Sequence, residues 1–397
     1  MAVSIRNRSR NRTPYASAYA PPKKRRPVLL DRELVERLDW VLIGACAAIA
    51  IFGVVMIYSA SRTVVPGDPT YFVKRQVLAL VIGVLLGIVI LRFDYRKWRD
   101  FSLIAYIGIV VLLFLVISPF GASVRGHQAW FQLPFGFQLQ PSELAKFGLV
   151  VALAGYVNEY RHDIDPWRLV VIVGLSLIPI ALVQLQGDLG TNIVLIFAVI
   201  GLLAVAGVPG RYLAILTGLG VTLIFAVISL GILQQYQVDR LTTVFSSSSG
   251  KHQTATAYNQ NQSVATISTG GFNGLGLFNG PQTRLGFVPE QQTDFIFTAV
   301  GEELGFVGGA LLLALFGLVI WRTWRTARIA SDFYGTMVCS GVLALFAFQI
   351  FENVGMTMGI MPVTGIPLPF MSYGGSSLLA SCACVALVSN VYARRFT

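Results

Sequence analysis

Asp294 is the residue of this chain best suited to chemistry at a membrane surface. It lies in the run Pro289–Phe297, where a long polar stretch meets a strongly hydrophobic segment. Two further carboxylates, Glu302 and Glu303, follow inside that segment. Ionisable side chains at membrane depth are costly, so each of these residues is a functional candidate by default. A carboxylate in this place could serve as a general base, with a pKa adjusted by burial and by its neighbours.

Asp294 also has a structural explanation of equal weight. Because it directly precedes an apolar run, its carboxylate could cap the helix that follows, and Thr293 could do so in its place. The helix dipole would then stabilise the charged form and make Asp294 a weaker base. Glu302 or Glu303 could likewise be structural, by hydrogen bonding across to Lys146.

Other ionisable residues predicted on the extracytoplasmic side also have both a structural and a functional explanation. Glu143 and Lys146 are three residues apart at a predicted helix start, so they could form a buried ion pair or line a substrate cavity. Asp188 opens another span, where it could cap the helix or shape a site. The cations predicted on this side are Lys74, Arg75, Arg125, Lys146, Arg240 and Arg284.

An uncharged segment between residues 355 and 377 contains three prolines and several glycines, which exclude a continuous helix. Its last residues, Gly374–Ser377, fall at a predicted helix start. Backbone N–H groups in such a place can bind an anion such as a phosphate. Close helix packing and capping account for these small residues as well.

These residues belong to a chain that has the composition of a membrane protein. Hydrophobic residues make up 55% of its 397 residues and charged residues only 12%, and the mean hydropathy is +0.68. This composition excludes a water-soluble domain and predicts an all-α polytopic membrane protein. We expect about ten transmembrane helices, near residues 40–58, 76–92, 101–118, 143–158, 168–185, 189–207, 211–233, 295–321, 334–353 and 371–392.

The net charge of +11 is unevenly placed, with eight lysines and arginines in the first 26 residues. Ten spans put both termini on one side, together with most loop arginines, and the positive-inside rule makes that side the cytoplasm. We predict a basic disordered cytoplasmic tail, 1–38, and one membrane domain, 39–397. The tail would act as a topology anchor or contact anionic membrane lipids, with no nucleic-acid partner. The large extracytoplasmic loop, about 234–294 between spans 7 and 8, should contain short helices.

Several motifs occur together and in a fixed order along the chain. They are Pro289–Phe297 with Glu302–Gly305, Pro362–Pro369 with Ser372–Ser377, Tyr58–Ser61, Gln140–Glu143 with Lys146, Asp188–Thr191, and Gln262–Ser263 with Gly270–Gly271. In this combination the chain resembles the SEDS family (shape, elongation, division and sporulation) over about residues 40–393. Within the family, Pro362–Pro369 is more similar to the branch of the elongation protein RodA than to that of the division protein FtsW. Gly187 and Ala129 depart from the family pattern, and the second leaves substrate contacts near Trp130 open.

The resemblance implies a peptidoglycan glycosyltransferase of the bacterial cytoplasmic membrane, with its active site facing outward. The substrate would be lipid II, polymerised during cell-wall elongation and the maintenance of cell shape. The family's essential aspartate corresponds to Asp294, as general base or acceptor-orienting group. Asp188, Glu302 and Glu303 would be structural or site-shaping. The implied substrate-binding residues, several of them cations for the leaving pyrophosphate, are Glu143, Lys146, Lys74, Arg75, Arg240, Ser376 and Ser377.

The family's usual partner is a class B penicillin-binding protein, a single-span transpeptidase. A divalent cation, Mg²⁺ or Mn²⁺, could assist at the pyrophosphate, although the sequence contains no evident ligand set for a metal. Two other functions fit the same charges: a lipid II flippase, and a non-catalytic scaffold for the transpeptidase. The lack of visible internal repeats favours the enzyme over the flippase.

Overall fold

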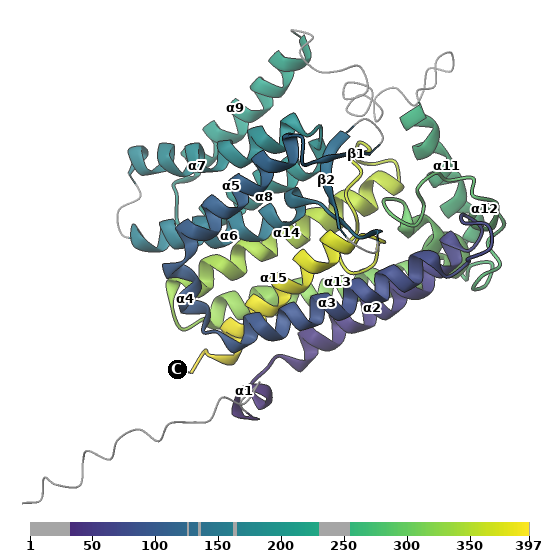
Figure 1. Ribbon diagram of the computed structural model, residues 1–397, viewed down its shortest axis with the longest axis horizontal. Helices are drawn as coiled ribbons and strands as arrows, with labels where there is room; N and C mark the ends of the chain where they lie inside the picture. The colour runs from purple at the N-terminus through teal and green to yellow at the C-terminus, as the bar shows by residue number, and fades with distance from the viewer. Residues whose placement is uncertain (1–31, 125–126, 134–135, 162–164, 230–254, 397) are drawn as a thin grey trace, which may run out of the picture.

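The computed structural model describes residues 32–124, 127–133, 136–161, 165–229 and 255–396. Each of the ten predicted spans corresponds to a helix (Figure 1), and the prediction of an all-helical polytopic membrane protein is confirmed. The helices are α2 (Trp40–Ser61), α3 (Tyr71–Arg92), α5 (Ser102–Ile117), α6 (Pro141–Glu159), α7 (Pro166–Leu185), α8 (Leu189–Val205), α9 (Gly210–Ser229), α13 (Ile296–Ile329), α14 (Phe333–Thr357) and α15 (Gly375–Ala393).

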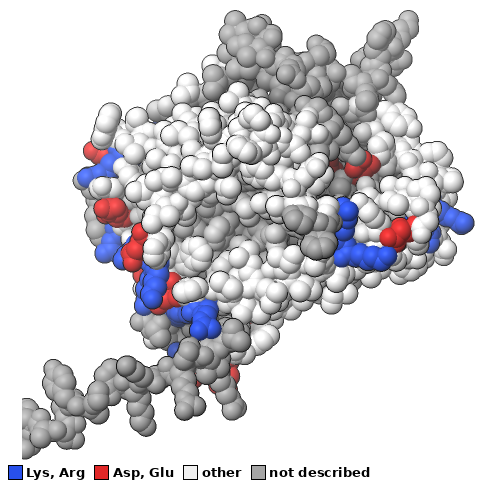
Figure 2. Space-filling model, in the orientation of Figure 1, with Lys and Arg blue, Asp and Glu red and all other residues white. Residues whose placement is uncertain are grey.

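Most of these helices have the composition that a bilayer requires. Within the described ranges, α2, α3, α7, α13, α14 and α15 are long and apolar enough to cross a membrane, and α5 and α8 are shorter apolar helices. Figure 2 shows one face of the molecule, on which Lys, Arg, Asp and Glu gather toward the two ends. Among the described residues on this face, the broad middle carries no charge, as the hydrocarbon layer of a membrane demands.

Two helices form the centre of the bundle. Of the apolar stretch of α15, 89% is buried inside the protein, and of α14, 72%, against 28% for α3 and α7. Helix α3 packs along α15, and small residues allow the close approach. A Cβ atom at Gly83 of α3 would lie only 2.8 Å from the sulfur of Cys382.

The two ends of the bundle carry different short elements. Helices α1 (Arg32–Glu36) and α4 (Tyr95–Asp100) lie at the same end as the C-terminus, and α11 (Ala255–Gly270) and α12 (Pro281–Leu285) lie at the other (Figure 1). Placing α1 and the C-terminus at one end requires an even number of crossings. The short helices predicted for the long loop are present as α11 and α12. The tail up to residue 31, and residues 230–254 with Arg240, lie outside the described residues.

A small antiparallel sheet that the sequence does not indicate occupies the connection between α5 and α6. Its strands are β1 (Ala122–Val124), β2 (His127–Gln132) and β3 (Gln138–Leu139), in the order β1-β2-β3. Ala122 pairs with Trp130, and Phe131 with Leu139. Strands of two to six residues are too short to show a reliable period-two pattern, which explains why only helices were expected here.

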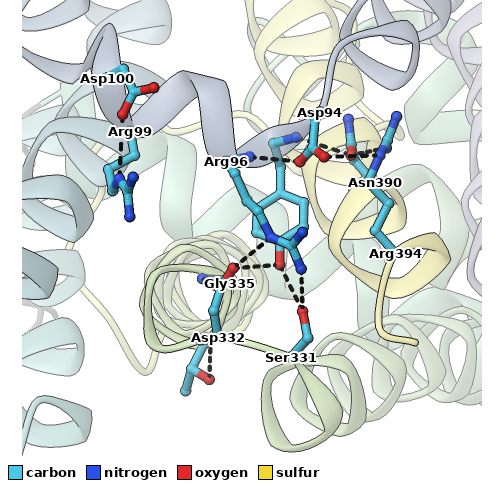
Figure 3. A network of polar contacts seen from close by, with 11 residues as sticks. Asp94, Arg96, Arg99, Asp100, Ser331, Asp332, Gly335, Asn390 and Arg394 are labelled. Carbon is cyan, nitrogen blue, oxygen red and sulfur yellow. Dashed lines mark hydrogen bonds and ion pairs between the residues drawn. The ribbon is translucent and has the colours of Figure 1, made fainter. Parts of the chain in front are cut away.

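The end that carries α4 is held by a polar network (Figure 3). The side-chain amide of Asn390 donates to the carbonyls of Ile90 and Phe93, both at 2.7 Å. These are carbonyls at the C-terminal end of α3, which lack partners within the helix. Arg96 of α4 donates to Asp332, the N-cap residue of α14, at 3.1 Å. The network therefore joins α3, α4, α14 and α15.

Helix α13 is interrupted at Gly305, whose φ of 62° and ψ of −158° are not helical. The interruption leaves two carbonyls without helical partners, those of Glu302 and Glu303. They accept the N–H groups of Leu275 and Gly276, at 3.0 and 2.9 Å. The N–H groups of the two residues after Gly305 donate to carbonyls of the same loop, at 3.0 and 3.2 Å. A neighbouring loop thus satisfies the backbone at the break, as an apolar surrounding requires.

We predict that Gly305→Ala destabilises the protein strongly, whereas Gly317→Ala does not. The backbone of Gly305 lies in a region that is essentially restricted to glycine, which alone costs about 1–3 kcal/mol for another residue. A Cβ there would also lie 2.3 Å from the backbone nitrogen of Gly274, whereas at Gly317 it would meet nothing within 4 Å. Thermal unfolding of the two purified variants in one detergent measures the difference. Equal melting temperatures would contradict the assigned conformation.

Candidate active site

A polar cavity of about 600 Å³ lies among the loops at one end of the bundle. Its walls come from the N-terminal ends of α3, α6, α8 and α15, from the small sheet, and from the loops before α13 and before α15. Trp130 of β2 is part of the wall. Segments far apart in the chain therefore assemble one enclosure.

Asp294 is half-buried and lines this cavity. It precedes α13, whose N-cap residue is Phe295, and no side chain caps that helix. The hydroxyl of Thr293 donates instead to the carbonyl of Glu290, at 2.9 Å. The expectation that Asp294 or Thr293 caps α13 is therefore wrong, because the helix begins one residue later than that role requires.

The turn that carries Asp294 is organised around Glu290. This residue has a φ of 53°, in the left-handed region. Its carbonyl accepts the N–H groups of Thr293 and Asp294, at 3.1 and 3.2 Å. The turn is also held from the opposite loop, because the N–H of Tyr373 donates to the carbonyl of Gln292 at 2.9 Å. Backbone contacts thus define where the aspartate leaves the chain.

Asp188 both caps a helix and lines the cavity. Its Oδ1 accepts the N–H of Thr191 at 3.0 Å, which caps α8. Its Oδ2 accepts from the side chains of Gln140 and Ser142, at 3.0 and 3.1 Å. One carboxylate therefore connects the starts of α6 and α8, so the capping predicted from the sequence is present together with a place in the cavity wall.

Glu143 and Lys146 form the predicted ion pair, with 2.7 Å between Oε2 and Nζ. Each side chain is only 4% exposed. Glu143 is part of the cavity wall, whereas Lys146 lies outside the lining residues. Desolvating two charges is costly, and the close pairing offsets that cost. Lys146 therefore stabilises the charge of Glu143 without lining the cavity itself.

The two adjacent cations of α3 have different surroundings. Arg75 lines the cavity, donates to the carbonyl of Gly136 at 3.0 Å, and stacks on Tyr71 at 4.2 Å. Burial raises the pKa of Tyr373, and a hydrogen bond from Arg75 opposes that rise. Lys74 is exposed and pairs with Asp68 at 3.1 Å, where hydrogen bonds from the Thr70 hydroxyl and from Lys74 lower the pKa of Asp68.

Helix α15 starts at the cavity without a capping side chain. Ser376 and Ser377 both line the wall. The hydroxyl of Ser376 donates to the carbonyl of Gln138 at 3.0 Å and accepts the N–H of Gln140 at 2.8 Å. Ser376 therefore joins the start of α15 to the segment between β3 and α6.

Glu302 and Glu303 are fully buried and lie outside the cavity wall. Glu302 accepts the N–H groups of Gln282 and Thr283, both at 2.8 Å, and so caps α12 from a different helix. Glu303 accepts from the hydroxyl of Ser59 and from the N–H of Phe278. The alternative that one of them reaches Lys146 is wrong, since these loop and helix groups occupy both carboxylates.

Two buried amides that hold the cavity loops were missed in the sequence. Gln76 of α3 donates to the carbonyl of Ser372 at 3.0 Å and accepts the N–H of Gly374 at 3.3 Å. Asn353 of α14 donates to the carbonyls of Asp294 and Ile366. An amide inside an apolar span needs hydrogen-bond partners, so its presence there is the signal that could have identified both.

The cavity is rich in carboxylates. Glu143, Asp188, Glu290 and Asp294 line it, and among the described lining residues Arg75 is the single cation. Within the described ranges, no three His, Cys, Asp or Glu side chains form a group that could hold a metal ion. The arrangement suits hydrogen bonding to hydroxyl groups at the carboxylates and contact with an anion at Arg75.

Comparison with known proteins agrees with this architecture. Residues 39–396 match the family of cell cycle proteins that is named after FtsW, RodA and SpoVE. The chain is 34% identical over 371 residues to a probable peptidoglycan glycosyltransferase FtsW of Geobacter metallireducens, covering 92% of this chain and 97% of that protein. This chain belongs to the FtsW/RodA/SpoVE family, also called the SEDS family.

Solved structures show the same fold. The rod shape determining protein RodA of Thermus thermophilus matches with a TM-score of 0.68 and 32% identity, covering 91% of this chain and 98% of that one. A chain from a structure described as structural coordination of polymerization and crosslinking by a peptidoglycan synthase complex matches with a TM-score of 0.77. It is 32% identical, with 91% of this chain and 99% of that chain covered.

We predict that Glu302→Gln lowers stability by about 2 kcal/mol, because hydrogen bonds to a charged acceptor are worth roughly 1.5–3 kcal/mol. A neutral amide would also turn its NH₂ group toward the N–H donors of α12. Glu159→Gln, the same change at an exposed position of α6, should change stability by less than about 0.5 kcal/mol. Denaturation of both variants in one detergent checks this. An equal effect of both would refute the capping role of Glu302.

Proposed function

We propose that this chain is a peptidoglycan glycosyltransferase that polymerises lipid II into glycan strands. The observation that carries the proposal is an aspartate, Asp294, held in a polar cavity at one end of a membrane-spanning bundle. The family match along nearly the whole chain supports the same activity. Lipid II has an apolar undecaprenyl chain and a polar disaccharide-pentapeptide, so a cavity at the end of such a bundle suits its two-part chemistry.

In this proposal Asp294 is the general base. The 4-hydroxyl of the acceptor GlcNAc attacks the anomeric carbon of the donor MurNAc and loses its proton to the Asp294 carboxylate. The bond from that carbon to the pyrophosphate breaks, and undecaprenyl pyrophosphate leaves. A single base with inversion at the anomeric carbon suits this step better than the paired carboxylates of retaining hydrolases.

The leaving pyrophosphate is assigned to the side of the cavity that contains Arg75. A guanidinium can donate two parallel hydrogen bonds to phosphate oxygens. The uncapped start of α15, with Ser376 and Ser377, adds backbone N–H groups close by, since Arg75 contacts Tyr373 two residues before that helix. Glu143, paired with Lys146, also lines the cavity.

We assign the chain to cell-wall elongation and cell-shape maintenance, as a RodA-like member of its family. The segment Pro362–Pro369 and the match to the Thermus RodA structure support this, while the FtsW relative represents division as the other outcome. We place the protein in the bacterial cytoplasmic membrane with the cavity outward, because the basic residues gather at the opposite end. The partner is a class B penicillin-binding protein, in keeping with the peptidoglycan synthase complex above.

Asp294→Asn is expected to abolish polymerisation by the purified protein with its transpeptidase partner and labelled lipid II. Losing the base should slow the reaction by roughly 10²-fold or more, and glycan ladders on a gel would disappear. Asp100→Asn, a matched change at an exposed carboxylate of α4, should leave the ladders unchanged. Unaltered ladders in Asp294→Asn would refute the assigned base.

The same experiment separates the competing functions. A scaffold would assemble with the transpeptidase but yield no ladders even in the wild-type protein. A flippase would move lipid II across liposome membranes without forming any polymer.

Arg75→Gln should raise KM for lipid II by about 10-fold or more, because a charge-assisted contact to phosphate is lost. Lys74→Gln should have a clearly smaller effect, since Lys74 is exposed, outside the cavity wall and screened by salt. Initial rates over a range of lipid II concentrations give both values. The reverse order would place the pyrophosphate outside the cavity.

A further inference from the structure

Asn353 joins two neighbouring segments of the cavity wall, the turn with Asp294 and the loop with Ile366. Its side chain has no solvent exposure. The amide nitrogen donates to the carbonyl of Asp294 at 2.8 Å and to the carbonyl of Ile366 at 2.7 Å. Both hydrogens of one planar group are therefore used, each on a different loop. Because the amide is rigid, the two bonds define the separation and orientation of the two carbonyls.

One of these loops is anchored independently of Asn353. Thr364 donates to Glu352, the neighbour of Asn353 on α14, at 3.0 Å. The same segment packs closely on the start of α8, where a Cβ atom at Gly190 would lie 2.8 Å from the carbonyl oxygen of Thr364. These contacts to α14 and α8 therefore hold the segment around Ile366 in place in the cavity wall.

The turn with Asp294 has a different kind of support. Its internal hydrogen bonds run to the carbonyl of Glu290, and no side chain caps the helix that follows. The contact from Asn353 is made to the backbone of the aspartate itself and comes from the buried centre of the bundle. A shift of this contact displaces the backbone of Asp294, from which the carboxylate projects.

We propose that Asn353 is a positioning residue that sets the location of the Asp294 carboxylate relative to the adjacent cavity loop around Ile366. This inference rests on the proposed function, in which Asp294 takes the proton of the acceptor hydroxyl. Asn353 touches the backbone of the base and no reacting atom. Its loss should therefore impair the chemical step more than substrate binding, since the wall with Arg75 and the start of α15 is held by other contacts.

Asn390 provides a matched control within the same chain. It is also fully buried, and its amide likewise donates to two carbonyls, those of Ile90 and Phe93, at 2.7 Å each. It lies at the end of the bundle opposite to the cavity. Asn353→Ala and Asn390→Ala therefore each remove a double donation from one buried amide, one beside the candidate base and one remote from it. Asn390→Ala also removes the acceptor of the Tyr95 N–H and of Arg394, so it is at least as disruptive to stability.

The test uses the full-length protein with its transpeptidase partner, labelled lipid II, and rates normalised to folded protein. Asn353→Ala should lower kcat by roughly 10²-fold, the usual effect of displacing a reacting group by about 1 Å, with KM changed by less than about 3-fold. Asn390→Ala should lower the melting temperature at least as much, with kcat within about 3-fold of wild type. Hydrogen exchange should accelerate at residues 290–295 in Asn353→Ala and stay unchanged there in Asn390→Ala.

Equal kcat values for the two variants, or unchanged exchange at residues 290–295 in Asn353→Ala, would overturn the inference. If the alanine variant does not fold, Asn353→Ser retains one donor, and an intermediate kcat is expected; a wild-type kcat would contradict the positioning role. A wild-type protein that forms no polymer would instead refute the proposed function. The exchange comparison would then still decide whether Asn353 holds the turn.

Discussion

The geometry of the cavity depends on the requirement that every backbone polar group inside an apolar layer finds a partner. Helix α13 breaks at Gly305, and the loop at residues 271–276 supplies the hydrogen bonds that the break removes. This exchange makes the first part of α13, residues 296–304, one unit with α11 and α12. Asp294 stands at the start of that unit, so the backbone of a distant loop determines where the candidate base can lie.

Buried carboxylates in this protein have two separate uses. Glu302 and Glu303 have structural roles, since their oxygens accept hydrogen bonds from α12, from α2 and from the loop between α11 and α12. Glu143 and Asp188 combine both uses, because each has a structural partner and also lines the cavity. This division explains how a bundle with few charges can hold several carboxylates at one end: most of them satisfy other groups before any substrate arrives.

The sequence predicts the parts of this architecture that depend on local pattern. Span positions follow from apolar length, and the Glu143–Lys146 pair and the Asp188 cap follow from helical spacing and position. The roles of Glu302 and Glu303 could not be predicted, because Glu303 meets Ser59 across 244 residues of sequence. Whether Asp294 caps α13 or lines the cavity depended on the exact start of α13, which sequence patterns do not define to within one residue. The partners of Asn353 could not be predicted, because they are backbone carbonyls and the sequence does not show which carbonyls lie beside a given side chain.

The distance in sequence between the walls of the cavity has a consequence for how the protein is made. Gln76 of α3 holds Ser372, which the ribosome adds 296 residues later, and Ser376 at the start of α15 holds Gln138 of β3. Synthesis runs from the N-terminus and domains assemble as units. A nascent chain in which α15 has not yet entered the bilayer therefore has an incomplete cavity, so the protein stays inert until the last helix is in place.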